Sequence, residues 1–129
     1  MDIKNKTSNY LIRNVVSDNY LNELRKIPML STEEEKALFI KYEESQVRLN
    51  AAKGLSNYEE VKSIETKIHD EIRNEIITRN QRFNFAVAKR YDNNDIIMDL
   101  VSIGAIGMYE AFQKYNYKEG VRFCTFAIW

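Results

Sequence analysis

The sequence predicts an all-α protein, a compact bundle of about five helices. One proline and four glycines in 129 residues leave long stretches without helix breakers, and apolar residues recur at helical spacing after good capping residues. A chain of this length usually forms one domain. We therefore expect a flexible N-terminal arm over residues 1–16, which show no helical period, and one helical domain over residues 17–129.

The first two helices are predicted from their starts and stops. Apolar residues at helical spacing follow Ser17 until Pro28 halts the turn, which indicates a short amphipathic helix. Ser31 and Glu34 then have the spacing of a capping box, and Gly54 is a C-terminal stop, so a long helix is expected between them.

A very long amphipathic helix is expected next. Ser56 and Glu59 repeat the capping spacing, and the helix should run toward Tyr91 with a break near Asn80. One face of this helix is marked by Val61, Ile64, Ile68, Ile72, Ile76, Phe83 and Val87.

The C-terminal part of the chain predicts two more helices. The segment from Ile96 to Tyr115 is apolar almost all round, which is typical of a central buried helix. Gly104 and Gly107 lie on one face of it, and each costs roughly 1 kcal/mol relative to alanine. We therefore expect another helix to approach closely there. After a turn at Gly120, a final helix should begin near residue 121.

Charge and composition exclude several classes of protein. Nineteen basic residues balance nineteen acidic ones, so any contact with DNA must be local; residues 31–71 are acidic and residues 72–129 mildly basic. One cysteine and one histidine provide neither a metal constellation nor a nucleophile–base pair, so we expect no metal, no cofactor and no enzymatic activity. The sequence has no signal peptide or membrane-spanning run, which favours a cytoplasmic protein.

Two stretches resemble bacterial sigma factors of the sigma-70 class. YLNELRKIPMLSTEEEKALF resembles region one-point-two of that family, and residues 76–129 resemble region two. The acidic residues from about 43 to 72 have no counterpart and are interpreted as an insertion. The ordered matches within region two are Asn80, Arg82, Ala88, Lys89, Arg90, Tyr91, Asp99, Leu100, Gly104, Ile106, Gly107, Ala111, Lys114, Gly120, Phe123, Thr125, Ala127 and Trp129.

The resemblance implies a transcription initiation factor that melts the promoter minus-ten element by capturing bases of the non-template strand. Stacking a base on an aromatic ring contributes about 1–3 kcal/mol, which suits the aromatic residues that close the chain. Phe112 and Phe123 are assigned to the core instead. The DNA-binding set that the resemblance implies is Tyr115, Lys114, Lys118, Arg122, Thr125, Phe126 and Trp129.

The resemblance also implies that the helix over residues 96–115 docks on core RNA polymerase, at the clamp coiled coil of the largest subunit. The polymerase-binding set is Asp99, Leu100, Ser102, Ile103, Ala105 and Tyr109. An anti-sigma factor is a further expected partner, and a membrane is not.

Departures from the family pattern leave an alternative open. Val121 and Phe126 stand where tyrosine is frequent in the family, and the chain ends inside region two. The alternative is a truncated or phage-encoded sigma-like protein that occupies the polymerase clamp without opening DNA. An unrelated helical enzyme is disfavoured, because the chain offers no catalytic constellation.

Four further features have a plain structural interpretation. The run Glu33 to Glu35 is interpreted as a charge cluster at a helix N-terminus, with a DNA contact as the alternative. His69 is expected on the surface, and Cys124 is expected to be an inert, half-buried thiol. The acidic insertion could also mask the DNA-binding face.

Overall fold

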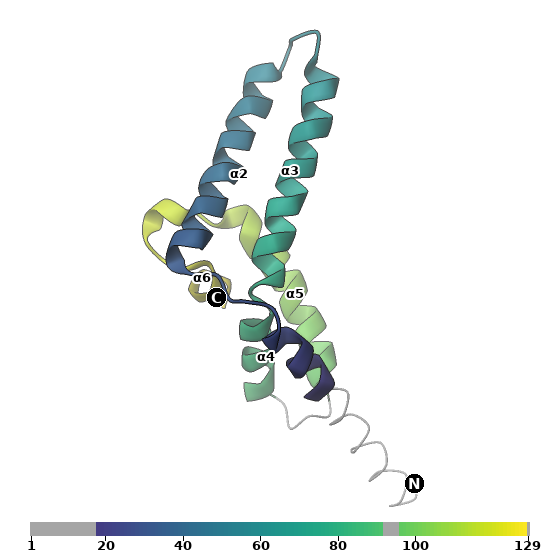
Figure 1. Ribbon diagram of the computed structural model, residues 1–129, viewed down its shortest axis with the longest axis vertical. Helices are drawn as coiled ribbons and strands as arrows, with labels where there is room; N and C mark the ends of the chain where they lie inside the picture. The colour runs from purple at the N-terminus through teal and green to yellow at the C-terminus, as the bar shows by residue number, and fades with distance from the viewer. Residues whose placement is uncertain (1–17, 92–95, 129) are drawn as a thin grey trace, which may run out of the picture.

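The computed structural model of the chain describes residues 18–91 and 96–128, and these are almost entirely helical. Residues 18–25 form a first helix, followed by α2 (Thr32–Ala52) and α3 (Tyr58–Thr78). After them come α4 (Gln81–Arg90), α5 (Ile97–Lys114), a short 3₁₀ turn η1 (Tyr117–Glu119) and α6 (Phe123–Ala127). Figure 1 shows α2 and α3 as a long antiparallel hairpin that projects from the other elements. The all-α prediction is confirmed.

The N-terminal arm and Trp129 lie outside the described residues. No helix in the part of the chain that the structure describes is long and apolar enough to cross a membrane.

The sequence predicts the start and the end of α2 correctly, but not the cap of α3. Ser31 and Glu34 form a reciprocal capping box at the start of α2, and Gly54 takes a positive φ of 83° just after the helix ends. The predicted cap of α3 is wrong. Asn57 occupies the N-cap position, and no side chain caps the helix there.

A buried carboxylate joins the two helices of the hairpin. Glu65 on α3 accepts hydrogen bonds from the Ser45 hydroxyl and from the Arg48 guanidinium, whose Nε lies 2.7 Å from Glu65 Oε1. The hydrogen bond from Arg48, followed by that from Ser45, lowers the pKa of Glu65. Glu65 and Ser45 are buried, so this part of the acidic stretch, residues 43–72, is a packed helix pair rather than a solvated charge run.

His69 lies one turn further along α3, and its predicted surface position is wrong. The imidazole is half-buried, with its ring centroid 4.7 Å from that of Tyr42, and its Nε2 is buried without a hydrogen-bond partner among the described residues. Burial lowers the pKa of His69 below its ordinary value of 6.5, although the nearby Glu65 and Asp70 act in the opposite direction and Arg48 adds to the decrease.

We therefore expect the free energy of unfolding to decrease as the pH is lowered through the ordinary pKa of histidine, 6.5. The unfolded chain binds a proton at His69 near pH 6.5, whereas the folded chain binds it only at lower pH, so the unfolded state is favoured as the pH falls. His69→Phe keeps a ring against Tyr42 and should flatten the dependence. Urea unfolding at several pH values measures both proteins, and parallel curves for the two would contradict the expectation.

The predicted break between α3 and α4 is confirmed. The helices are separated at Arg79 and Asn80, and the buried Asn80 amide donates to the carbonyl of Ile76 at 2.7 Å. Because of the break, α4 turns away from the hairpin and packs on α5. A small core of Leu24, Phe85, Ala88, Ile97 and Val101 joins the first helix, α4 and α5.

Three arginine side chains hold the link that leads from the first helix into α2. Arg82 donates to three carbonyl oxygens at the end of the first helix, at 3.0 to 3.4 Å. Arg79 reaches the carbonyl of Pro28 at 2.9 Å, and Arg122 reaches that of Leu30 at 2.9 Å. Carbonyl oxygens at the end of the first helix and in the link thus accept from side chains of the C-terminal half of the chain, and Leu24 O also accepts from the backbone N–H of Ile27.

The main core lies where the base of the hairpin meets α5 and α6. Phe112 and Phe123 are 5% and 0% exposed, which confirms their assignment to the core. Phe39 of α2 packs against both rings, with centroids 5.7 and 6.0 Å away. The other buried members are Leu30, Ile72, Ile76, Ile77 and Met108.

The prediction that α5 is buried all round is wrong. Ile103 and Ile106 are 64% and 61% exposed, and Tyr109 is 41% exposed. The pair of glycines also divides: Gly104 faces the Asn84 side chain closely, whereas no atom of another element approaches Gly107. Only Gly104 therefore marks a close approach of a second helix.

Candidate functional site

The segment from Tyr115 to Ile128 turns back over the base of α2. The Asn116 side chain caps η1 by accepting from the backbone N–H of Lys118 at 3.0 Å. Gly120 then takes a positive φ of 79°, which only glycine adopts at little cost, and the chain reverses into α6. The predicted turn is confirmed, and α6 begins at Phe123, two residues later than expected.

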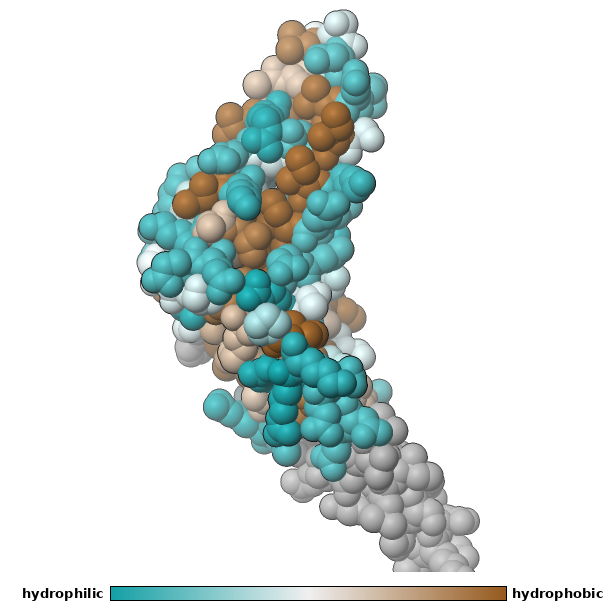
Figure 2. All heavy atoms as spheres, viewed as in Figure 1, coloured by the Kyte–Doolittle hydropathy of each residue, from teal (hydrophilic) through white to brown (hydrophobic). Residues whose placement is uncertain are grey.

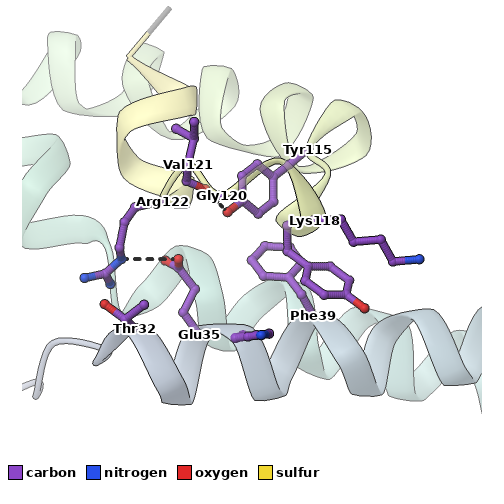
Figure 3. A pocket seen from close by; sticks show the side chains of 10 residues that line it. Thr32, Glu35, Phe39, Tyr115, Lys118, Gly120, Val121 and Arg122 are labelled. Atoms are coloured by element: carbon purple, nitrogen blue, oxygen red, sulfur yellow. Dashed lines mark hydrogen bonds and ion pairs between the residues drawn. The ribbon is translucent and has the colours of Figure 1, made fainter.

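A pocket of about 480 Å³ lies between this segment and the first turns of α2. Figure 3 shows Glu35 and Phe39 rising from α2 toward Tyr115 and Arg122, which come from the opposite wall. The pocket is also lined by Thr32, Lys36, Tyr117, Lys118, Gly120 and Val121. Three members of the predicted DNA-binding set thus share one hollow: Tyr115, Lys118 and Arg122.

Tyr115 is the half-buried aromatic centre of this site. Its ring lies 4.6 Å from Phe39 and 5.5 Å from Phe126, measured between centroids, and its hydroxyl donates to the carbonyl of Val121. Burial, reinforced by the negative charge of Glu35, raises the pKa of Tyr115 to about 12. The phenol therefore stays neutral and holds the turn in place.

Glu35 connects α2 to the closing segment and corrects the interpretation of the acidic run. Its carboxylate is 4% exposed, and Oε2 accepts from Arg122 Nε and from the backbone N–H of Phe123, both at 3.3 Å. Glu33 and Glu34 are exposed, as a helix N-terminal cluster should be. Glu35 instead neutralises Arg122, one of the cations that line the pocket.

A second carboxylate of α2 faces the same segment. Glu43 Oε1 lies 3.3 Å from the Lys118 ammonium, at an exposed ion pair. Burial raises the pKa of the neighbouring Tyr117, and the negative charge of Glu43 adds to the increase. Two cations of the predicted DNA-binding set are therefore paired within the chain.

Of the other members of the DNA-binding set, Thr125 and Phe126 lie on α6 and Lys114 ends α5, whereas Trp129 is outside the described residues. Phe126 is half-buried and, with Lys114, lines a groove of about 440 Å³ between α5 and α6. Thr125 is exposed, whereas Cys124 is half-buried with a free thiol, as predicted. The rings of Tyr115 and Phe126 thus form a wall with the pocket on one side and the groove on the other.

The predicted polymerase-binding residues share one exposed face of α5 only in part. Asp99, Ser102, Ile103 and Tyr109 are exposed, and together with the exposed Ile106 they recur at steps of three to four residues along one stripe. The Ser102 hydroxyl donates to its own helix, to the carbonyl of Met98 at 3.1 Å. Leu100 instead packs against the core formed with the first helix, and Ala105 is half-buried.

Tyr109 stands at the edge of this stripe and contacts α3. The guanidinium carbon of Arg73 lies 5.3 Å from its ring centroid, and its hydroxyl is 3.5 Å from Asn74 Oδ1. We define the docking stripe as Asp99, Ser102, Ile103, Ile106 and Tyr109. Of these, the sequence analysis did not assign Ile106 to polymerase binding.

Comparison with known proteins agrees with this arrangement. Residues 76–129 match the model of the family described as sigma-70 region 2. That range runs from the end of α3 through α6, and so contains the docking stripe and the aromatic wall. Residues 76–129, somewhat less than half of the chain, are therefore similar to sigma-70 region 2, as the resemblance implied.

Relatives of this family match more of the chain than region 2 alone. The chain is 29% identical over 111 residues to the RNA polymerase sigma factor SigA4 of Synechococcus elongatus, covering 85% of the chain and 35% of that protein. It is 28% identical over 111 residues to SigA of Clostridium acetobutylicum, covering 85% and 23%. The RNA polymerase sigma factor RpoD of Neisseria gonorrhoeae is 34% identical over 64 residues, covering 49% and 10%. The chain thus spans about a third or less of these relatives.

The contribution of α2 to the pocket was not predicted from the sequence. Glu35 and Phe39 line the pocket from the side opposite to the predicted residues. The available signal was helical spacing. Glu35 and Phe39 are four residues apart, as are Leu38 and Tyr42, and this spacing places Glu35 on the face of α2 that packs inward.

Proposed function

We propose that this chain acts as part of a transcription initiation sigma subunit, which binds core RNA polymerase and captures single-stranded bases of the non-template minus-ten element. The match of residues 76–129 to the sigma-70 region 2 family supports the class of protein. The balance of nineteen basic and nineteen acidic residues supports a factor that binds DNA weakly alone and gains affinity when polymerase positions it.

The observation that carries the proposal is the aromatic wall. Tyr115 and Phe126 are adjacent, and each borders an open hollow. Lys114 lies in the groove, and Lys118 and Arg122 lie in the pocket, within reach of a backbone phosphate that accompanies a base. An unstacked base placed on an aromatic face recovers about 1–3 kcal/mol, which is comparable with the cost of extruding it.

The docking stripe on α5 supplies the proposed polymerase contact. Ile103 and Ile106 present exposed apolar side chains, and Asp99 adds a carboxylate at the N-terminal end of the stripe. Apolar side chains that exclude water, with charges at the rim, are the usual composition of a protein interface. The proposed partner surface is the clamp of the largest subunit, and an anti-sigma factor that competes for the stripe belongs to the same proposal.

A rival function is favoured by the paired cations. Because Glu35 and Glu43 engage Arg122 and Lys118, a phosphate must displace a carboxylate before it can bind either side chain. A chain in which these pairs persist would occupy polymerase without opening DNA. The two functions differ in what Phe126 does.

In the complex with core RNA polymerase, Phe126→Ala should weaken binding of a labelled single-stranded minus-ten oligonucleotide by about 10- to 100-fold, because the stacking face is lost. Phe126→Tyr keeps the ring and should bind nearly as well as the unaltered chain. Fluorescence anisotropy measures binding with and without polymerase from the organism that encodes the chain. Co-elution with polymerase and the thermal unfolding midpoint confirm that the variants still assemble and fold.

Two outcomes would decide between the functions. If Phe126→Ala binds polymerase and DNA as the unaltered chain does, the aromatic wall is no capture surface. If the unaltered chain joins polymerase and DNA never binds the complex, the rival function holds.

A further inference from the structure

An apolar stripe runs along one side of the α2–α3 hairpin. Leu38, Ile68 and Ile72 line a groove of about 340 Å³ between the helices. Ile64, one turn before Ile68 on the same face of α3, is 55% exposed. Figure 2 shows apolar side chains extending over the hairpin between polar margins. Exposed apolar residues gathered in one stripe, rather than scattered singly, mark an interaction surface.

The rest of the described chain packs against a different side of the hairpin. Phe39, Tyr42 and Glu43 of α2 contact residues of α5 and the closing segment. At 100° per residue, the groove positions 41, 44 and 48 lie on the opposite flank of α2. The apolar stripe is therefore free when the docking stripe and the aromatic wall are both in use.

Charges on the two margins of the groove differ in sign. The α2 margin carries Lys41 and Arg48 together with one carboxylate, Glu44, whereas the α3 margin carries Glu71 and Glu75. Arg48 and Glu75 have ion-pair partners in their own chain. Lys41 and Glu71 have none among the described residues, so their charges are available to another molecule.

We propose that this face is the interface of a homodimer, in which the hairpins of two copies pack side by side with α2 of each against α3 of the other. Ser45 and Glu65 are bonded across the hairpin and therefore mark one level along it. With a rise of 1.5 Å per residue, Lys41 lies about 6 Å and Glu71 about 9 Å below that level. A two-fold axis parallel to the hairpins keeps these heights, so Lys41 of each copy meets the partner's Glu71.

The size of the face sets the expected strength of the dimer. Two helices of 21 residues are about 30 Å long and together about 20 Å wide, which gives a face of about 600 Å². Stable interfaces of standard size use roughly 800 Å² per partner. We therefore expect a reversible dimer that dissociates on dilution, not a permanent one.

Sedimentation equilibrium of the whole chain at several concentrations tests the proposal. The mean mass should rise with concentration from 15.2 kDa toward twice that value. Ile64→Glu should weaken association by about 100-fold, because it places an unpaired carboxylate in the centre of the interface, and an exposed position tolerates the change without unfolding. The matched control is Ile106→Glu, an equally exposed apolar residue on α5, which should dimerise normally.

Mixing two charge variants tests whether Lys41 of one copy contacts Glu71 of the other. It also distinguishes this contact from an ion pair of the two residues within one chain. Lys41→Glu and Glu71→Lys should each self-associate at least tenfold more weakly, because like charges meet at both symmetric contacts. A mixture of the two should form a heterodimer, since glutamate then meets lysine at one contact and the unaltered pair meets at the other.

Two outcomes would overturn the proposal. The first is a monomer at every accessible concentration. The second is self-association that Ile106→Glu abolishes and Ile64→Glu leaves intact, which would place the contact on α5. The proposed register would be overturned if mixing Lys41→Glu with Glu71→Lys failed to restore association.

Discussion

Replacing Gly104 with alanine is expected to destabilise the fold by about 1–3 kcal/mol. An added Cβ would overlap the amide oxygen of Asn84 and lie 3.0 Å from its Cγ. Asn84 cannot swing away cheaply, because it is buried and its amide nitrogen donates to Val101 O at 2.9 Å and to Gln81 Oε1 at 3.1 Å. The bond to Val101 joins α4 to α5, so alanine must either break this contact or separate the helices.

Gly107 provides the matched control for this prediction. It lies in the same helix, three residues on, and a Cβ there would meet no atom within 4 Å. Gly107→Ala should therefore stabilise the chain by up to about 1 kcal/mol through helix propensity alone. Urea unfolding followed by circular dichroism measures both changes. Equal effects of the same sign would show that α4 and α5 do not approach closely at Gly104.

The contrast between the two glycines shows where sequence reasoning reaches its limit. Their spacing correctly placed both glycines within one helix. Only the position of the neighbouring helix decides which of the two is in close contact with it. The position of α4 depends on the break between α3 and α4 at Asn80. The sequence indicated this break but not the direction in which α4 continues after it. Helical period and capping are local properties, whereas close approach is not.

The same limit explains the errors at α5 and Glu35. Hydropathy predicted burial around all of α5, because Ile103 and Ile106 are apolar, but exposed apolar residues are tolerated and here form a stripe. Glu35 was grouped with its neighbours by charge, although its inward direction follows from its spacing to Phe39. The core assignments of Phe112 and Phe123 are confirmed, since both side chains are buried, whereas the DNA-binding role of Phe126, which borders a groove, stays a prediction.

The largest effect on function is expected from Ile106→Arg in the docking stripe, which rests on the proposed function. Ile106 is 61% exposed, so the side chain should be accepted in the free chain with a change in stability within about 0.5 kcal/mol. In a closed interface, the guanidinium would be buried without a partner on an apolar surface. Removal of a central apolar anchor together with burial of an unpaired charge should weaken association with core RNA polymerase at least 100-fold.

Two further substitutions make this prediction specific. Ile103→Arg, at an equally exposed position of the stripe, should act in the same way, whereas Leu55→Arg at the tip of the hairpin should not, although Leu55 is 58% exposed. Biolayer interferometry with immobilised polymerase measures all three. Because the three variants add the same charge, a shared loss would indicate general electrostatic repulsion. Loss confined to Ile103 and Ile106 would assign the contact to α5, and unchanged binding of both would exclude the stripe as the docking surface.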